Sequence, residues 1–247
     1  MRPFGRTRAF TTLSFLMLRI PIWLFAPPQR RRRHEQAFFA GLSKGFGIHT
    51  VNRGTPSTKP GTLFVMNHVS WADIPVMLAL LDADFVAKSD MKDWPVIGAL
   101  ARRFNPVFVS RTEQFKSQAQ VSEIRKRLAS GRSVILCPEG TTSDGTGILP
   151  FRTTLFAAAD SASVVQAVVI RYLSAEGTAL SPHRQREVAW IDDDDLLSGA
   201  IRLAKSSTLA QVEFLPPVAA KIDRKELASL VRDQMRAAHA AAPKRLV

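Results

Sequence analysis

The stretch Thr62-Leu-Phe-Val-Met-Asn-His-Val-Ser-Trp-Ala-Asp-Ile-Pro-Val-Met-Leu-Ala-Leu-Leu81 runs from an apolar segment through a polar turn into a second apolar segment with helical spacing. Residues 62–66 predict a strand, and residues 71–81 predict a helix. The alternation continues with strand candidates at 85–88, 106–109, 133–137, 164–170, 188–191 and 212–215, and helix candidates at 94–103, 114–130, 153–161, 196–204 and 224–240. Such alternation predicts an α/β fold, a central mixed β-sheet flanked by helices, with functional loops at the carboxyl ends of strands.

Length and composition restrict the class of protein. The chain has 247 residues, of which 46% are hydrophobic and 22% are charged, and its Pro and Gly are spread without a repeat. This composition excludes a disordered, collagen-like or solenoid protein. The single cysteine, Cys137, excludes an intramolecular disulfide framework and a zinc site of several cysteines, and it fits a reducing compartment.

Basic charge is concentrated at the N-terminal end. The chain carries a net charge of +13, and its first 34 residues contain eight arginines and no acidic residue. Residues 10–26 are mostly apolar, but Arg19 and Pro21 interrupt a stretch that is already shorter than the ~20 residues of a spanning helix. We therefore expect an apolar helical membrane anchor that lies in the interface or re-enters it shallowly. A secretory signal peptide and an ordinary buried helix are the alternatives.

The pattern of residue types changes near residue 55. We expect residues 1–55 to form a basic and apolar segment that associates with an anionic membrane surface, and residues 56–247 to form the α/β domain. The arginines at 30–33 favour the cytoplasmic side for this flank. The expected location is the cytoplasmic face of the inner cell membrane, with the chain monotopic or shallowly inserted.

His68 lies at the end of the first strand candidate, and Asp73 lies five residues further on. In such a pair the carboxylate can fix the imidazole tautomer and stabilise the imidazolium that forms when the histidine takes a proton. The structural alternative is an aspartate that caps a helix beside a loop histidine. These two residues are the candidate catalytic pair.

Two further segments end apolar strands with polar residues. In Val134-Ile-Leu-Cys-Pro-Glu-Gly-Thr-Thr-Ser-Asp-Gly145, the Gly/Thr/Ser turn offers N–H groups and hydroxyls to an anion. Glu139 would repel a phosphate, so we expect it to bind a substrate hydroxyl or to hold an arginine, unless it is a solvated loop carboxylate. Phe108-Val-Ser-Arg-Thr112 presents Arg111, whose planar fork suits phosphate recognition, although a surface arginine would look the same.

Taken in order, these segments resemble the glycerolipid acyltransferase family, which acylates lysophosphatidic acid and related lysolipids. The family's Asn-His-x-x-x-x-Asp block matches residues 67–73, its strand ending in arginine matches Arg111, and its Pro-Glu-Gly-Thr block matches residues 138–141. The resemblance covers roughly residues 63–170. It implies catalytic roles for His68 and Asp73 and substrate-binding roles for Asn67, Arg111, Glu139, Gly140 and Thr141.

The chain departs from the family pattern in two places. Thr142 stands where the family often has arginine, which puts one phosphate contact in question, and the later Val-Pro-Val strand appears as Val165-Gln-Ala-Val168. Residues 142–145 and 148–152 are similar to a bacterial branch that includes lyso-ornithine lipid acyltransferases. The acceptor of that branch is zwitterionic, and Arg111 with Glu139 could face its carboxylate and amine.

The resemblance implies an O-acyltransferase that moves a fatty acyl group from acyl-CoA or acyl carrier protein to the hydroxyl of a lysolipid. The acceptor expected first is 1-acyl-sn-glycerol-3-phosphate, which would give phosphatidic acid, and lyso-ornithine lipid is the alternative. His68, oriented by Asp73, would take the hydroxyl proton as the oxygen attacks the thioester carbonyl. This chemistry requires no acyl-enzyme, metal or other cofactor, and no nucleic-acid partner is expected.

Other patterns give competing hypotheses. Gly41-Leu-Ser-Lys-Gly45 matches the elbow of serine hydrolases, but Ser43 follows a helical pattern instead of a strand. Cys137 could be a thiol nucleophile, although its place within a strand pattern favours a core residue. A basic nucleic-acid-binding protein would fit the charge, but the arginines flank an apolar run. The acidic run 192–195 is interpreted as a solvated turn that caps the next helix, and not as a metal site.

Overall fold

The computed structural model describes residues 7, 11, 14, 17, 27–88, 106–109, 114–191 and 194–241 of the chain. The helix expected at 94–103 lies outside the described residues, as does the apolar stretch 10–26 except for positions 11, 14 and 17. Among the helices that are described, none is long and apolar enough to cross a membrane.

Seven strands form one sheet in the order β1-β7-β6-β2-β5-β3-β4. Their bounds are β1 (Ile48–Arg53), β2 (Thr62–Met66), β3 (Ala83–Lys88), β4 (Val107–Val109), β5 (Ser133–Leu136), β6 (Val164–Leu173) and β7 (Thr208–Phe214). All neighbouring pairs are parallel except β6 and β7, which are antiparallel. The predicted α/β fold with a mixed sheet is therefore confirmed, and the carboxyl ends of β2, β5, β3 and β4 meet at one edge.

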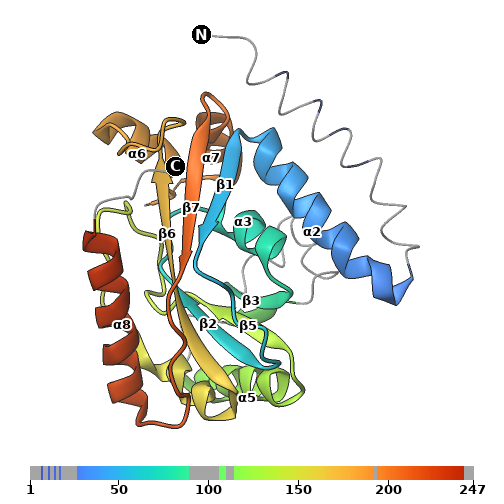
Figure 1. Ribbon diagram of the computed structural model, residues 1–247, viewed down its shortest axis with the longest axis vertical. Helices are drawn as coiled ribbons and strands as arrows, with labels where there is room; N and C mark the ends of the chain where they lie inside the picture. Colours follow the sequence, from blue (N-terminus) through green and yellow to red (C-terminus); the bar gives the residue numbers. More distant parts are fainter. Residues whose placement is uncertain are drawn as a thin grey trace.

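Helices cover both faces of this sheet (Figure 1). The helix α5 (Gln114–Ala129), the 3-10 helix η2 (Thr153–Ser161) and α8 (Arg224–Ala240) pack on one face. The helices α3 (Asp73–Leu80), α6 (Pro182–Val188) and α7 (Leu196–Leu203) pack on the other. The remaining described helix, α2 (Pro28–Gly45), lies against α3 through Phe38 and Phe39.

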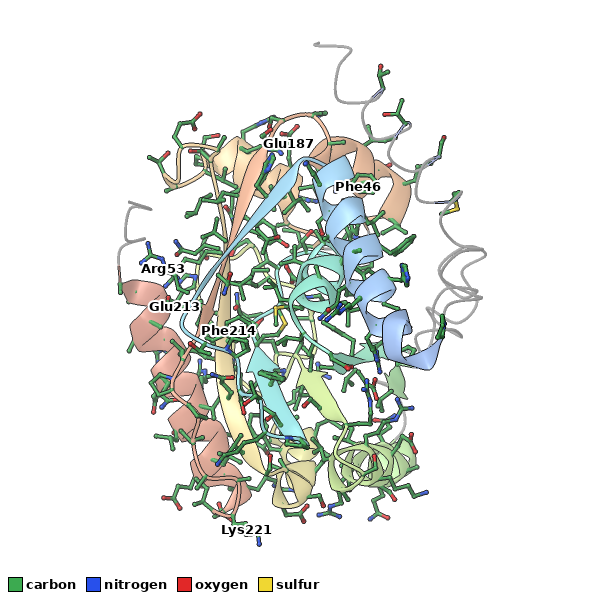
Figure 2. All side chains as sticks on the ribbon, turned by 45° about the vertical axis from the view of Figure 1, so that its right-hand side comes forward. Phe46, Arg53, Glu187, Glu213, Phe214 and Lys221 are labelled. Atoms are coloured by element: carbon green, nitrogen blue, oxygen red, sulfur yellow. The ribbon has the colours of Figure 1, made fainter. Side chains whose placement is uncertain are left out.

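Strand β2 is the centre of the core, because it lies between β6 and β5 and every one of its residues is buried. Its side chains alternate between the two faces, as strand geometry requires: Leu63 and Val65 join the α5 and α8 side, whereas Phe64 and Met66 join the α3 side. Phe214 of β7, labelled in Figure 2, lies in this second core with its ring edge-on to Phe64 at a centroid distance of 6.3 Å. The packing of β2 in the core thus fixes the position of residues 67–73, which follow the strand.

One predicted strand is absent from the sheet, and one observed strand was not predicted. Residues 188–191 form no strand: α6 ends at Val188, and the next residues follow it without joining the sheet. The strand β1 was not predicted, because the adjacent polar residues His49 and Thr50 break the alternation that indicates a strand. It pairs in parallel with β7 at the sheet edge, where one side can face water. The sheet therefore includes residues that the sequence had placed in the N-terminal segment.

Candidate active site

His68 and Asp73 form a hydrogen-bonded pair where β2 ends and α3 begins. The Nδ1 atom of His68 lies 2.7 Å from Oδ2 of Asp73. Because an ionised carboxylate only accepts hydrogen bonds, the proton of a neutral His68 sits on Nδ1 and the lone pair on Nε2. The His68 side chain is 15% exposed, and its Nε2 has no hydrogen bond to any described residue. The pair therefore presents a basic nitrogen that a substrate proton can reach.

Asp73 is fully buried and holds the turn as well as the imidazole. Its Oδ2 also accepts hydrogen bonds from the backbone N–H groups of Val69, at 2.8 Å, and Ser70, at 3.0 Å. Its Oδ1 accepts a hydrogen bond from the hydroxyl of Tyr172 on β6, at 2.6 Å. Burial, followed by the charge of Asp73, raises the pKa of Tyr172 well above its ordinary value, so Tyr172 remains a donor.

Asn67, which was predicted to bind substrate, is fully buried beside the pair. Its Nδ2 donates to the carbonyl oxygen of Ile170 at 3.0 Å, and its Oδ1 accepts from the N–H of the same residue at 2.8 Å. The amide therefore extends the pairing of β2 with β6 by one residue beyond the strand. This geometry favours a positioning role for Asn67 over contact with a ligand.

Glu139 lies on the loop that follows the neighbouring strand β5, and it is 4% exposed. Its Oε1 accepts from the N–H of Leu149 at 3.1 Å, and its Oε2 accepts from the N–H of His68 at 3.4 Å. Burial raises the pKa of Glu139 to about 7, although these two N–H groups act in the opposite direction. The side chain is thus not the solvated carboxylate considered from the sequence, and it links the two loops of the site.

Residues 137–152 are called the site loop below. The N–H of Ser143 donates to the carbonyl oxygen of His68 at 2.8 Å, which is a second contact of this loop with residues 67–73. These residues carry the candidate catalytic pair and are named the catalytic turn. Gly140 has a φ of 70°, in the left-handed region that favours glycine. Thr141 is exposed. Of the remaining predicted site residues, Arg111 lies outside the described residues, two positions after the end of β4.

The departure at Thr142 has a structural explanation. Its hydroxyl donates to the carbonyl oxygen of Trp190, whose own N–H donates to the carbonyl oxygen of Val69 at 2.9 Å. The segment that follows α6 is thereby held between the catalytic turn and the site loop. At this position a short hydroxyl side chain joins two loops, whereas the family often has an arginine there.

Helix α8, which packs on the face of the sheet away from α3, supports the site loop through two side chains. Arg232 donates from Nε to the carbonyl oxygen of Leu149 at 3.1 Å, and His239 contacts the carbonyl oxygen of Gly145 through Nε2 at 3.2 Å. Burial, followed by the nearby charge of Arg171, lowers the pKa of His239. Neither residue was predicted to have a role, since a helical pattern does not indicate which loop the helix contacts.

Tyr172 could have been noticed from the sequence. It is the single tyrosine of the chain and lies in a long apolar strand pattern. A buried tyrosine usually requires a partner for its hydroxyl. That signal predicts a polar neighbour without telling which one.

The competing motifs lie elsewhere or have structural roles. Ser43 is 2% exposed inside α2, not at a turn between a strand and a helix, so it does not have the geometry of a hydrolase elbow. Cys137 is half-buried and packs on the α3 side of the core. In the acidic run, Asp195 caps α7 by accepting from the N–H of Ser198, and Asp194 pairs with Arg186 and Arg202, whereas 192 and 193 lie outside the described residues.

Comparison with known proteins identifies the class. A family model described as acyltransferase matches residues 47–171. A lyso-ornithine lipid O-acyltransferase of Brucella abortus is 38% identical over 207 residues, which cover 78% of this chain and 76% of that protein. A 1-acyl-sn-glycerol-3-phosphate acyltransferase of Neisseria gonorrhoeae is 32% identical over 182 residues, which cover 68% of this chain and 71% of that protein.

A solved structure shares the fold. The crystal structure of the lysophosphatidic acid acyltransferase of Thermotoga maritima matches with a TM-score of 0.67 and 20% sequence identity, covering 95% of this chain and 89% of that one. The fold and the family model together define an α/β acyltransferase. More particularly, the chain belongs to the acyltransferase family of lipid metabolism and is a lysolipid O-acyltransferase.

Proposed function

We propose that this chain is a lyso-ornithine lipid O-acyltransferase. The relatives that support this acceptor are those of Brucella abortus, at 38% identity, and Rhizobium meliloti, at 34% identity over 229 residues. Thr142 adds support, because the loop lacks at that position the arginine that the family often uses toward a phosphate. The order of the two acceptors expected from the sequence is thereby reversed.

The reaction rests on one observation, the His68–Asp73 pair with its open Nε2. The acceptor hydroxyl attacks the thioester carbonyl while Nε2 of His68 takes its proton, which leaves an imidazolium beside the Asp73 carboxylate. The tetrahedral intermediate then expels the thiolate of the donor, which takes the proton from His68. The products are the O-acylated lipid and free CoA or acyl carrier protein, and His68 returns to its neutral form.

The other predicted site residues take roles that fit their contacts. Asn67 ties the end of β2 to β6, and Glu139 ties the catalytic turn to the site loop. Gly140, the exposed Thr141 and Arg111, which follows β4 in the sequence, are proposed to bind the acceptor. Residues 1–55 bring the enzyme to the anionic cytoplasmic face of the membrane, where acceptor and product reside.

The test is acyl transfer by detergent-solubilised protein with lyso-ornithine lipid and lysophosphatidic acid in parallel, each offered acyl-CoA and acyl carrier protein thioesters. We expect the His68→Ala variant to lose at least roughly a hundredfold in kcat. The control is His183→Ala, which changes an exposed histidine on α6. A His68→Ala enzyme that keeps its turnover would overturn the mechanism, and failure to acylate lyso-ornithine lipid would overturn the proposed acceptor.

The second candidate acceptor is 1-acyl-sn-glycerol-3-phosphate. The observation in its favour is the Neisseria gonorrhoeae relative, which is 32% identical across most of both chains. The parallel assay decides between the candidates through kcat/KM for the two lipids. A preference of more than about tenfold, which corresponds to 1.4 kcal/mol, would assign the acceptor.

A further inference from the structure

Asp144 is an acidic residue of the site loop that lies beside the catalytic turn. The residue before it, Ser143, donates its N–H to the carbonyl oxygen of His68 at 2.8 Å. The residue after it, Gly145, has a φ of 77°, and a Cβ atom added there would lie 3.2 Å from Cγ1 of Val69. Because both of its neighbours along the chain contact the catalytic turn, Asp144 lies directly beside the His68–Asp73 pair.

Two helices hold the backbone of this part of the site loop. Gln185 of α6 donates from Nε2 to the carbonyl oxygen of Asp144, and a Cβ atom added to Gly145 would lie 2.7 Å from the same Nε2. His239 of α8 contacts the carbonyl oxygen of Gly145 through its own Nε2 at 3.2 Å. Contacts with the catalytic turn, α6 and α8 therefore fix the place of Asp144 in the site.

The Asp144 carboxylate has one oxygen available to a ligand. Its Oδ1 accepts hydrogen bonds from the N–H of Thr146 at 2.9 Å and from the hydroxyl of the same residue at 2.7 Å. These two bonds, the N–H first, lower the pKa of Asp144, so the group is ionised at neutral pH. The side chain is exposed, and its Oδ2 has no hydrogen bond or ion pair with any residue that the structure describes. This oxygen can therefore accept a hydrogen bond from a ligand cation.

The other two carboxylates of the site loop and the catalytic turn already have partners. Glu139 was considered from the sequence as the group that faces the amine of a zwitterionic acceptor, but it is 4% exposed and both of its oxygens accept backbone N–H groups. Asp73 is fully buried, and its oxygens are bonded to His68, to two backbone N–H groups and to Tyr172. Within residues 67–73 and 137–152, Asp144 is the carboxylate that remains for a headgroup.

We propose that Asp144 binds the primary ammonium group of the lyso-ornithine lipid headgroup and thereby determines acceptor specificity. This inference rests on the proposed function and deepens it. An ammonium group has three N–H donors, of which one can reach the free Oδ2. The phosphate of lysophosphatidic acid has no such donor when ionised, and the same carboxylate repels it. Asp144 therefore favours one acceptor by attraction and disfavours the other by repulsion.

The experiment measures equilibrium binding without a thioester donor, so that no turnover occurs. The ligands are lyso-ornithine lipid, the same lipid with its amine acetylated, and lysophosphatidic acid, all in one detergent. We expect Asp144→Asn to raise Kd for lyso-ornithine lipid about fivefold, the effect of losing an exposed ion pair, and to change Kd for the acetylated lipid less than about twofold. Kd for lysophosphatidic acid should fall, because the repulsion is removed.

The asparagine variant keeps an oxygen that can accept from Thr146, so the loop should retain its conformation, and Asp144→Ser is the second variant if asparagine prevents folding. The matched control is Asp233→Asn, which changes an exposed aspartate on α8. Equal effects of Asp144→Asn on the free and the acetylated lipid, or an unchanged Kd for lyso-ornithine lipid, would overturn the proposal.

Acyl transfer by the wild type separates this proposal from the proposed function. If binding depends on both Asp144 and the free amine, but wild type does not acylate lyso-ornithine lipid, the ammonium site is supported and the proposed function is overturned. If wild type acylates this lipid and Asp144→Asn does so with the same kcat/KM, the proposed function stands and the ammonium site is overturned.

Discussion

The two carboxylate oxygens of Asp73 have different partners. Oδ2 is hydrogen-bonded to His68 and the catalytic turn, and Oδ1 accepts a hydrogen bond from Tyr172. Because Tyr172 comes from β6, its hydrogen bond also anchors the orienting carboxylate to a strand buried deep in the sheet. A carboxylate held from two sides keeps the imidazole in one orientation, which is what proton transfer requires. Tyr172 is therefore a positioning residue for the pair.

Tyr172→Phe should lower kcat roughly tenfold and leave the acceptor KM within about twofold, because it removes one hydrogen bond to a charged group without touching the substrate. The measurement is a double-mutant cycle with Asp73→Asn. In the Asp73→Asn background the second substitution should have little further effect on kcat, since the group it positions is already altered. Effects that simply multiply would show that Tyr172 does not act through Asp73.

Glu139 makes stability depend on pH. Its folded pKa of about 7 lies above the ordinary value of 4.5, so the folded protein holds a proton that the unfolded chain releases between these pH values. The free energy of unfolding should therefore fall as pH rises from about 4.5 to 7, by about 3 kcal/mol at most, and then level off.

Glu139→Gln should remove this component, which is measured by urea unfolding of both proteins across that pH range. As pH rises, the free energy of unfolding of Glu139→Gln should increase relative to that of wild type. The control is Glu226→Gln, which changes an exposed residue. A pH-independent difference between Glu139→Gln and wild type would contradict the assignment.

At the scale of elements, the site loop is supported by a helix that contributes no atom to the catalytic pair. Arg232 of α8 holds the carbonyl oxygen of Leu149, and the N–H of Leu149 is bonded to Glu139, which reaches His68. The packing of α8 on the sheet is thus connected to the catalytic turn by a chain of hydrogen bonds.

Arg232→Ala should speed the hydrogen exchange of residues 145–149 and lower activity roughly fivefold to tenfold, because it frees the loop that carries Glu139. Amide exchange followed by mass spectrometry provides the measurement. Arg236→Ala on the same helix is the matched control, since Arg236 is exposed. A lower Tm with unchanged exchange in the site loop would rule out this coupling.

At the scale of the whole molecule, the arginine run at 30–33 is not uniform. Arg32 is paired within the protein, with Glu35 at 3.1 Å and with Asp82 at 3.0 Å. Asp84, beside Asp82, also receives Arg127 at 2.8 Å and Arg132 at 2.6 Å, so this cluster ties α2 to β3 and α5. The neighbouring Arg33 is exposed.

Arg33→Ser should therefore weaken binding to phosphatidylglycerol vesicles about fivefold at low salt, the effect of about 1 kcal/mol for one basic residue near an anionic surface. Arg32→Ser should change binding less than about twofold and lower the Tm instead, because its charge is already neutralised. Vesicle co-sedimentation with each variant, repeated at high salt, measures both. Equal losses of vesicle binding would contradict the distinction between the two arginines.

The features that can be predicted from the sequence alone are local. The pattern of residues 62–66 and the helical period of 224–240 predicted β2 and α8 with their observed bounds, because strand and helix periodicities are set by neighbours along the chain. The spacing of His68 and Asp73 likewise predicted their pairing, since one turn separates them. The order of the motifs was sufficient to indicate a lysolipid acyltransferase, in agreement with the relatives.

Tertiary packing brings together the distant segments that complete the site. Tyr172 reaches Asp73 from 99 residues away because β6 is the neighbour of β2 in the sheet, and Ser143 reaches His68 because the site loop folds against the catalytic turn. The edge strand β1 exists through its pairing with β7, not through its own pattern. Strand order and loop closure depend on the packing of the whole core, and no local period encodes them.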